Sequence, residues 1–257
     1  MQLHDNTIFI TGGTSGIGKG LAESFHQRGN QVIITGRREE RLKEICQSNP
    51  GMRYFVLDVT SRETLQTVAR KAIEEFPAIN CVVSNAGIQI RCNFAPGNAI
   101  DDHVLQQEID TNLLGPIRVA AAFIAHLATR PGATLVNVSS GLAFVPMVRF
   151  PVYCATKAAI HAWTLSLREQ LRSASVRVIE IVPPWVATEL GSPGTPASIP
   201  SAGRGPMSLE AFVAETMKEL ESGAEEVAIG DARRLAAAAS PDTVKKAFSA
   251  INAPWVT

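Results

Sequence analysis

The sequence predicts an α/β fold in which a doubly wound parallel sheet of about seven strands carries helices on both faces. Three observations support this prediction. Short apolar runs rich in β-branched residues alternate along the chain with segments of helical periodicity. A glycine-rich loop joins the first predicted strand to the first predicted helix. Polar residues follow several of the strands, at the edge where parallel sheets bind ligands.

The composition is that of a single globular domain over residues 1–257. Apolar residues make up 46% of the chain and charged residues 19%, which is too apolar for disorder. Lys+Arg and Asp+Glu are each 24, so the net charge of zero argues against nucleic acid or an anionic membrane as a partner. The four cysteines lack metal-site spacing and no apolar run could span a bilayer, so we expect a reduced, cytoplasmic protein without a metal.

The first strand, loop and helix form the kind of unit that binds dinucleotides. We predict strands at 7–11 and 31–35, with a helix between them that closes near Gly29. Glycine lets the backbone approach a pyrophosphate, and the helix N-terminus offers free N–H groups and a positive dipole end. An ordinary glycine turn is the alternative for this loop taken alone. The loop residues predicted to contact the cofactor are Gly12, Thr14, Ser15, Gly16, Ile17 and Gly18.

The residues after the second strand indicate which dinucleotide is bound. An acidic residue here would hydrogen-bond the adenosine ribose of NAD, but the chain has Gly36 followed by Arg37 and Arg38. A guanidinium group matches a 2′-phosphate in charge and geometry. We therefore predict a preference for NADP(H), with NAD(H) possible, and rank Arg37 above Arg38. The alternative is that both arginines are solvated residues at the start of the next helix.

Helices and strands continue to alternate beyond this point. The segments with helical patterns or helix start signals lie at 38–47, 61–76, 109–127 and 209–220. The short apolar runs that predict strands lie at 53–58, 80–84, 134–138, 176–182 and 225–229. The Gly- and Pro-rich segment 191–206 follows the sixth strand, and we predict that it is a flexible flap over the substrate. A last helix at 240–251 and a loose tail at 253–257 complete the prediction.

Several polar residues are predicted to lie at the carboxyl edge of the sheet. Asp58 ends the third strand and Asn85 follows the fourth, which places both where a cofactor would lie, although both residue types also favour turns. Asn112, Gly115 and Pro116 are unusual choices inside a helix. Such a local inconsistency marks either a functional site or a kink.

The segment from Ser140 to Lys157 carries the candidate chemistry. Tyr153 and Lys157 are one helical turn apart on a helix that Pro151 suits at its first turn, so both side chains project from one face. An ammonium group near a tyrosine favours the phenolate and lowers its pKa. With Ser140 to hydrogen-bond a substrate oxygen, the group could move a proton to or from a carbonyl or an alcohol. Taken alone, the spacing would favour a helix-start aromatic and a solvated lysine; the other motifs reverse that judgement.

Together these motifs resemble those of the short-chain dehydrogenase/reductase family, in order, at family spacing and across nearly the whole chain. The matching positions are Thr11-Gly12-x-x-x-Gly16-x-Gly18, Asn85-Ala86-Gly87, Asn112, Ser140 and Tyr153-x-x-x-Lys157. The resemblance implies a single-domain Rossmann fold and hydride transfer between nicotinamide and an alcohol or carbonyl substrate. It implies that Tyr153 is the acid/base, that Lys157 holds the nicotinamide ribose and lowers the tyrosine pKa, that Ser140 orients the substrate and that Asn112 supports a relay water.

The resemblance also implies cofactor contacts in other parts of the chain. These positions are Asp58, Val59, Asn85, Ala86, Gly87, Tyr153, Lys157, Pro183, Val186 and Thr188. The run Pro183-Pro184-Trp185 departs from the Pro-Gly turn usual in the family, because proline replaces the flexible glycine. This difference predicts a stiffer wall beside the nicotinamide, with Trp185 narrowing the space there. This version of the run resembles a bacterial subgroup of DltE-type oxidoreductases.

The substrate and the partners are predicted only as classes. Phe144, Met147, Val148 and Phe150 suggest an apolar substrate pocket, with core packing as an equal alternative, and Arg91 and Arg149 are candidates to bind an acidic group. We expect a small-molecule alcohol or carbonyl substrate. Homodimers or homotetramers, common in the family, would use the helices that carry Asn112 and Lys157, with Phe123 and Trp163 as apolar residues. A non-catalytic nucleotide-binding sensor is the competing hypothesis, ranked lower because the Tyr–Lys pair is retained.

Overall fold

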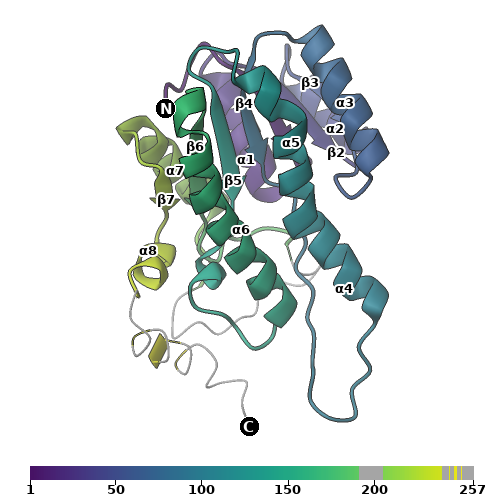
Figure 1. The fold of residues 1–257 in the computed structure, drawn as a ribbon, viewed down its shortest axis with the longest axis vertical. Coiled ribbons are helices and arrows are strands. Elements are labelled where there is room, and N and C mark those ends of the chain that lie inside the picture. The colour runs from purple at the N-terminus through teal and green to yellow at the C-terminus, as the bar shows by residue number, and fades with distance from the viewer. Residues whose placement is uncertain (191–204, 239–242, 244–245, 248–249, 251–257) are drawn as a thin grey trace.

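In the computed structural model, the described part of the chain is residues 1–190 and 205–238, together with 243, 246–247 and 250 (Figure 1). Seven parallel strands form one sheet in the order β3-β2-β1-β4-β5-β6-β7. The strands are β1 (Thr7–Thr11), β2 (Gln31–Gly36), β3 (Arg53–Val56), β4 (Ile79–Ser84), β5 (Thr134–Val138), β6 (Arg177–Val182) and β7 (Glu226–Ala228). The strand order reverses between β1 and β4, which creates the crevice where open α/β sheets bind ligands. The predicted doubly wound sheet is confirmed.

Helices cover both faces of this sheet. They are α1 (Gly16–Gln27), α2 (Glu39–Ser48), α3 (Arg62–Glu75), α4 (Asp102–Ile109), α5 (Gly115–Leu127), α6 (Pro151–Gln170), α7 (Leu209–Ser222) and α8 (Asp231–Ala236). Alternate residues of β1 face opposite sides: Ile8 and Ile10 pack with α1, α2 and α7, whereas Phe9 packs with α3, α5 and α6. Figure 1 shows α5 and α6 in front of the sheet and α1 behind it. Two apolar cores therefore hold the layers together.

The helix predicted at 109–127 is longer and less regular than expected. It begins at Asp102, because the Asp101 carboxylate caps it by accepting a hydrogen bond from the His103 N–H at 2.9 Å. A π-helical turn, η1 (Asp110–Leu114), separates α4 from α5 and contains Asn112. Such turns are frequent at functional sites. The irregular composition noted in the sequence therefore marks a change from α-helix to π-helix within a continuous helical segment.

Other predictions need smaller corrections. The strand predicted at 53–58 ends at Val56, so Asp58 lies two residues beyond it. Helix α8 was not predicted at all. Of the predicted flap, residues 191–204 lie outside the described part of the chain, as do the tail at 253–257 and most of the helix predicted at 240–251. Among the described residues, no helix combines the length and the apolar character needed to cross a membrane.

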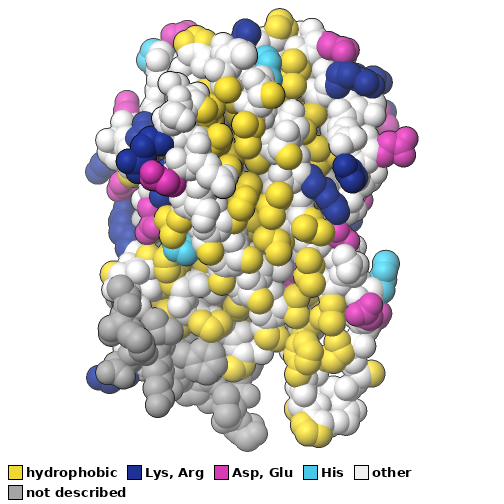
Figure 2. All heavy atoms as spheres, viewed as in Figure 1, with side chains coloured by type: hydrophobic (Ala, Val, Ile, Leu, Met, Phe, Trp, Pro, Cys, Tyr) yellow, Lys and Arg dark blue, Asp and Glu magenta, His cyan; other side chains and the backbone are white. Residues whose placement is uncertain are grey.

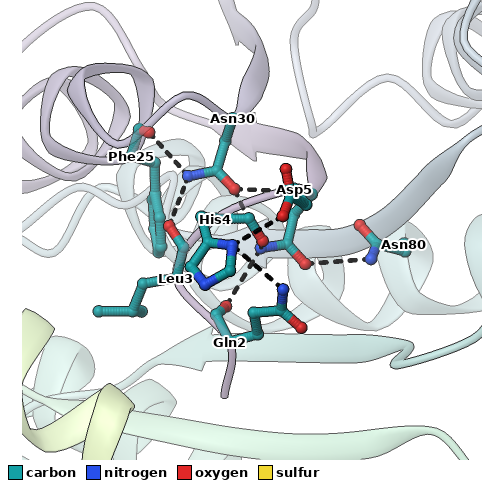
Figure 3. A network of polar contacts seen from close by, with 8 residues as sticks. Gln2, Leu3, His4, Asp5, Phe25, Asn30 and Asn80 are labelled. Atoms are coloured by element: carbon teal, nitrogen blue, oxygen red, sulfur yellow. Dashed lines mark hydrogen bonds and ion pairs between the residues drawn. The ribbon is translucent and has the colours of Figure 1, made fainter.

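The amino edge of the sheet is held by a network of asparagines (Figure 3). The Asn30 amide donates to the Leu3 and Phe25 carbonyl oxygens, both at 2.7 Å, and its own oxygen accepts from the Asn6 N–H at 3.0 Å. Asn80 donates to the Asn6 side chain at 3.0 Å. This edge therefore satisfies its own polar groups, while the residues with predicted chemistry lie at the opposite, carboxyl edge.

Candidate active site

The glycine loop between β1 and α1 is clamped by the segment that follows β4. The Asn85 amide donates to the carbonyl oxygens of Thr11 and Gly12, at 3.1 and 3.2 Å. The Thr11 hydroxyl accepts from the N–H groups of Asn85 and Ala86, at 3.0 and 3.2 Å. A Cβ at Gly18 would overlap the Gly12 carbonyl oxygen and the Asn85 amide, so the loop requires glycine there. Two motifs more than 60 residues apart in the sequence thus form one surface at the carboxyl edge.

The N-terminus of α1 fits the phosphates of a dinucleotide. The residue that precedes the helix, Ser15, makes no side-chain capping bond, and the first turn has no acidic residue. Its N–H groups and positive dipole end therefore remain available to an anion. A Cβ at Gly16 would lie 3.2 Å from Thr188, which places that predicted contact beside the loop. Ile17, in the first turn, packs against the core formed with α2 and α7.

Arg37 and Arg38 are both exposed, but of the two only Arg38 has a hydrogen bond to the glycine loop among the described residues. The Arg38 guanidinium donates to the Thr14 hydroxyl at 3.0 Å and to the Ser15 hydroxyl at 3.2 Å. Of the two arginines ranked from the sequence, Arg38 is therefore the one that contacts the loop.

Glu189 is an acidic residue near this site that sequence analysis missed. Its carboxylate lies 3.7 Å from Arg38 and 3.0 Å from Arg41. The bridge links the segment after β6 to α2 across the glycine loop. Sequence spacing gave no signal for it, because about 150 residues separate the partners.

Asp58 makes the hydrogen bonds of a turn, and its contact with the cofactor stays a prediction. Its carboxylate accepts hydrogen bonds from the N–H and the hydroxyl of Thr60, at 2.9 and 2.8 Å. Its neighbour Val59 packs against Gly115, where a Cβ would lie 3.1 Å from the valine side chain. The pair therefore connects the end of β3 to the π-helical turn.

The four residues predicted to be catalytic are all buried. The Ser140 side chain lies beside the Tyr153 hydroxyl and favours its ionised form, which lowers the pKa of Tyr153. The Lys157 ammonium donates to the Val138 carbonyl at 2.8 Å and lies 5.7 Å from the centre of the Tyr153 ring. The Ser140 oxygen also caps a short turn, η2 (Gly141–Ala143), by accepting from the Leu142 N–H.

Asn112 joins this group through the backbone. Its side-chain oxygen accepts from the Ile88 N–H and its amide donates to the Ile88 carbonyl, both at 2.8 Å. The amide also donates to the Thr156 hydroxyl at 3.3 Å. A Cβ at Gly87 would lie 3.3 Å from the Asn112 oxygen and 3.8 Å from the Lys157 nitrogen. Gly87 thus lies between the asparagine and the lysine, and the predicted residues come together.

The electrostatics of the pair differ from what the sequence predicts. Burial raises the pKa of Tyr153 above its ordinary value, and the neighbouring Ser140 hydroxyl only partly opposes this effect. Burial also lowers the pKa of Lys157 to about 8, while the charge of Glu180 acts in the opposite direction. The predicted lowering of the tyrosine pKa by Lys157 is therefore wrong for this structure, because desolvation of the phenolate outweighs the other effects.

Glu108 is a further buried acid that the sequence analysis missed. One carboxylate oxygen accepts from the Ile90 N–H at 2.9 Å, and the other has no partner within the described residues. Burial raises the pKa of this carboxyl. Glu108 lies one helical turn before Asn112, and the two side chains hold the backbone of 88–90. That four-residue spacing was a signal that could have revealed it.

The residues between Ser140 and Tyr153 divide between a cavity and the core. Met147 and Val148 line a cavity of about 560 Å³. Phe150 packs with Tyr153 and Cys154, and the Phe144 ring lies 4.5 Å from that of His161. The other residues that line the cavity are Cys92, Asn93, Phe94, Leu142, Ala143, Pro146, Pro151, Cys154, Ala155 and Ala158. Two of the four residues thus line a cavity and two pack against other side chains, while the role of the cavity as a substrate pocket stays a prediction.

The segment after β6 is held from both sides. The Pro183 carbonyl accepts from the Gly141 N–H at 2.9 Å, which fixes it beside the Ser140 turn. Val186 is buried and pairs with Met207, whose N–H donates to the Trp185 carbonyl at 2.9 Å. This wall therefore has a defined conformation through its backbone contacts. Of the two arginines considered for substrate binding, Arg91 is exposed and Arg149 lies over the Phe150 ring at 5.9 Å.

Comparisons with known proteins agree with this architecture. The sequence profile of a family described as short chain dehydrogenase matches residues 6–197. The uncharacterized oxidoreductase DltE of Bacillus subtilis is 45% identical over 190 residues, which cover 74% of this chain and 75% of that protein. The NADP-dependent 3-hydroxy acid dehydrogenase YdfG of Shigella flexneri is 32% identical over 177 residues, covering 68% and 71%.

A solved structure matches the whole chain. It is a short chain dehydrogenase from Burkholderia cenocepacia in complex with NADP, with a TM-score of 0.81, 25% sequence identity and coverage of 100% of both chains. The family profile covers most of the sequence, and the sheet order and the clustered motifs agree with it. The chain belongs to the short-chain dehydrogenase family.

Proposed function

We propose that this protein is an NADP(H)-dependent oxidoreductase that interconverts an alcohol and a carbonyl on a small molecule. The observation that carries the proposal is the burial of Ser140, Tyr153, Lys157 and Asn112 as one group beside Gly87. This group lies at the same sheet edge as the glycine loop. A sensor would need the loop but would have no use for a buried acid/base group next to it.

The chain's own residues would handle the substrate oxygen and its proton. Bound nicotinamide supplies or accepts the hydride. Ser140 would hydrogen-bond the substrate oxygen, and Tyr153 would exchange a proton with it. Burial raises the pKa of Tyr153, so its hydroxyl is protonated at neutral pH and could donate to a carbonyl oxygen. The Lys157 ammonium would then stabilise the phenolate, and Asn112 would hold the loop at Ile88 in place.

Substitution of the tyrosine tests the catalytic role. We expect Tyr153→Phe to remove NADPH oxidation with every active carbonyl substrate while NADPH binding, followed by fluorescence, changes little. Turnover retained by this variant would contradict the role of Tyr153. If the wild-type protein binds NADPH tightly but turns over no member of a broad carbonyl panel, the sensor hypothesis replaces the enzyme hypothesis.

The preference for NADP(H) is supported by Arg38. Its guanidinium lies over the Thr14 and Ser15 hydroxyls, at the end of β2 where the adenosine ribose would bind. YdfG, at 32% identity, is named NADP-dependent. Arg38→Ala should weaken NADPH binding at least tenfold and leave NADH binding almost unchanged, with Arg37→Ala as the matched control. Equal losses for both cofactors would contradict the assignment.

The cavity lined by Pro151 and Cys154, which flank Tyr153 in the sequence, supports a substrate with an apolar part, although none of Ser140, Tyr153 and Lys157 lines it. Met147, Val148 and Leu142 form an apolar wall of this cavity, whose volume is that of a small ligand site. A panel that pairs aliphatic and aryl carbonyls with 3-oxo acids of matched length would define the class. Val148→Asp, at a half-buried residue of this cavity outside the Tyr153 cluster, should raise KM for apolar substrates much more than it lowers kcat.

Self-association and a cytoplasmic location stay predictions. Figure 2 shows hydrophobic side chains gathered over α5 and α6 on one face of the molecule. Leu165 of α6 is 45% exposed, whereas Phe123, a predicted contact residue, is buried in the core against Phe9. Trp163 also packs against that core. Light scattering that gives a monomer mass would reject association.

A further inference from the structure

A polar cluster lies between α6 and the β6–β7 edge of the sheet, apart from the catalytic hydroxyls. Glu180 of β6 is fully buried, and its partner in register on β7 is Glu226. Partners in register on neighbouring strands point to the same face, so the two carboxylates are neighbours. His161 of α6 reaches them, and its Nδ1 lies 2.8 Å from Glu180 Oε2. The side-chain ligand atoms of all three residues lie within 4.8 Å of one another.

The Glu180 carboxylate is only half satisfied by the described residues. Oε2 is bonded to His161, but the buried Oε1 has no hydrogen-bond partner there. An unpaired carboxylate oxygen in the protein interior is costly and calls for a bound water or an ion. The two oxygens belong to one carboxylate, so Oε1 also lies at the cluster. Glu226 is exposed, which leaves the site open to solvent on one side.

We propose that His161, Glu180 and Glu226 bind a divalent transition-metal ion, with Zn²⁺ as the best match. One imidazole and two carboxylates are the mixed nitrogen and oxygen ligands that Zn²⁺ accepts, whereas Mg²⁺ and Ca²⁺ prefer oxygen alone. Ligand atoms 2.8 Å apart can both lie about 2.0–2.2 Å from one ion. The ion would bind His161 Nδ1 in place of the proton that now lies between this nitrogen and Glu180. The neutral imidazole would then carry its one N–H proton on Nε2. Its charge would offset the buried carboxylate.

Zinc titration of the full-length, untagged protein tests this proposal. Isothermal titration calorimetry should show one site per chain, and thermal unfolding should shift to higher temperature with Zn²⁺ but not with Mg²⁺. Glu226→Gln and His161→Ala should each weaken Zn²⁺ binding at least tenfold. Glu225→Gln is the matched control, because Glu225 is the exposed sequence neighbour whose carboxylate lies 3.4 Å from Arg168 instead. It should bind Zn²⁺ as the wild type does.

Cysteines could bind zinc independently, so their contribution must be separated. Cys46 and Cys92 are partly exposed free thiols. Co²⁺ bound at the proposed site should give a spectrum without a thiolate-to-metal charge-transfer band, and Cys46→Ser/Cys92→Ser should retain the site. The proposal is overturned if Zn²⁺ binding is not saturable, if it survives Glu226→Gln and His161→Ala, or if it disappears with the cysteines.

Discussion

Replacement of Lys157 by methionine should reveal the energetic cost of keeping this lysine charged. Burial lowers the pKa of Lys157 from its ordinary 10.5 to about 8. Each unit corresponds to about 1.4 kcal/mol, so the charged form destabilises the folded chain by roughly 3 kcal/mol. Between pH 8 and 10.5 the unfolded chain binds the proton and the folded chain does not, so stability rises with pH across that interval. The destabilisation is fully present below pH 8.

Methionine fills similar space but carries no proton, so it removes this pH dependence. It also leaves the Val138 carbonyl without its donor, which costs about 1–3 kcal/mol and makes the net effect at pH 7 small. The sharper readout is therefore the difference in free energy of unfolding between wild type and Lys157→Met. From pH 7 to pH 10 that difference should move by about 2–3 kcal/mol in favour of the wild type. Turnover should be lost throughout.

Urea unfolding followed by circular dichroism at pH 7 and pH 10 measures this difference. Lys71→Met is the control, because Lys71 is exposed and its removal should change stability equally at both pH values. A Lys157→Met difference that is the same at both pH values would refute the reasoning. It would mean that Lys157 is solvated or fully compensated in the folded protein.

Three other substitutions follow from the packing and the charges. Glu108→Gln keeps an acceptor for the Ile90 N–H. Because burial raises the pKa of Glu108, the wild type loses stability as the pH rises through that pKa. The free energy of unfolding of the variant, measured with urea, should therefore increase relative to that of the wild type between about pH 4 and pH 7. An unchanged difference between the two proteins would contradict this. Gly18→Ala should weaken NADPH binding at least tenfold in a fluorescence titration, whereas Gly20→Ala, whose Cβ would meet only side-chain atoms, should have a much smaller effect. Phe123→Ala should lower the free energy of unfolding by about 3–5 kcal/mol, measured by denaturation, because Phe123 is buried against Phe9; a loss below about 1 kcal/mol would show that the core collapses around the cavity.

The sequence by itself determined the order of the elements and the motifs on them. Short apolar runs coincide with the strands because buried parallel strands need continuous hydrophobic sequence, and β1 and β5 have the predicted bounds. The glycine loop and the Tyr153–Lys157 pair are local patterns, whose geometry follows from a turn and from one turn of helix. The helix that carries the pair begins at Pro151, as predicted.

Tertiary structure decided the properties that depend on which distant residues meet. The spacing of Arg37 and Arg38 could not show which guanidinium turns to the glycine loop, because that depends on how α2 packs beside it. The direction of the Tyr153 pKa depends on desolvation, which arises only when the chain is folded around the side chain.

The cluster of His161, Glu180 and Glu226 shows the same limit. These residues are 19 and 46 positions apart, so no spacing rule connects them. The parallel register of β6 and β7 makes the two carboxylates neighbours, and the packing of α6 over β6 brings the imidazole to them. Local sequence specifies each strand and helix, but the register between strands and the packing of helices on the sheet determine which side chains share a site.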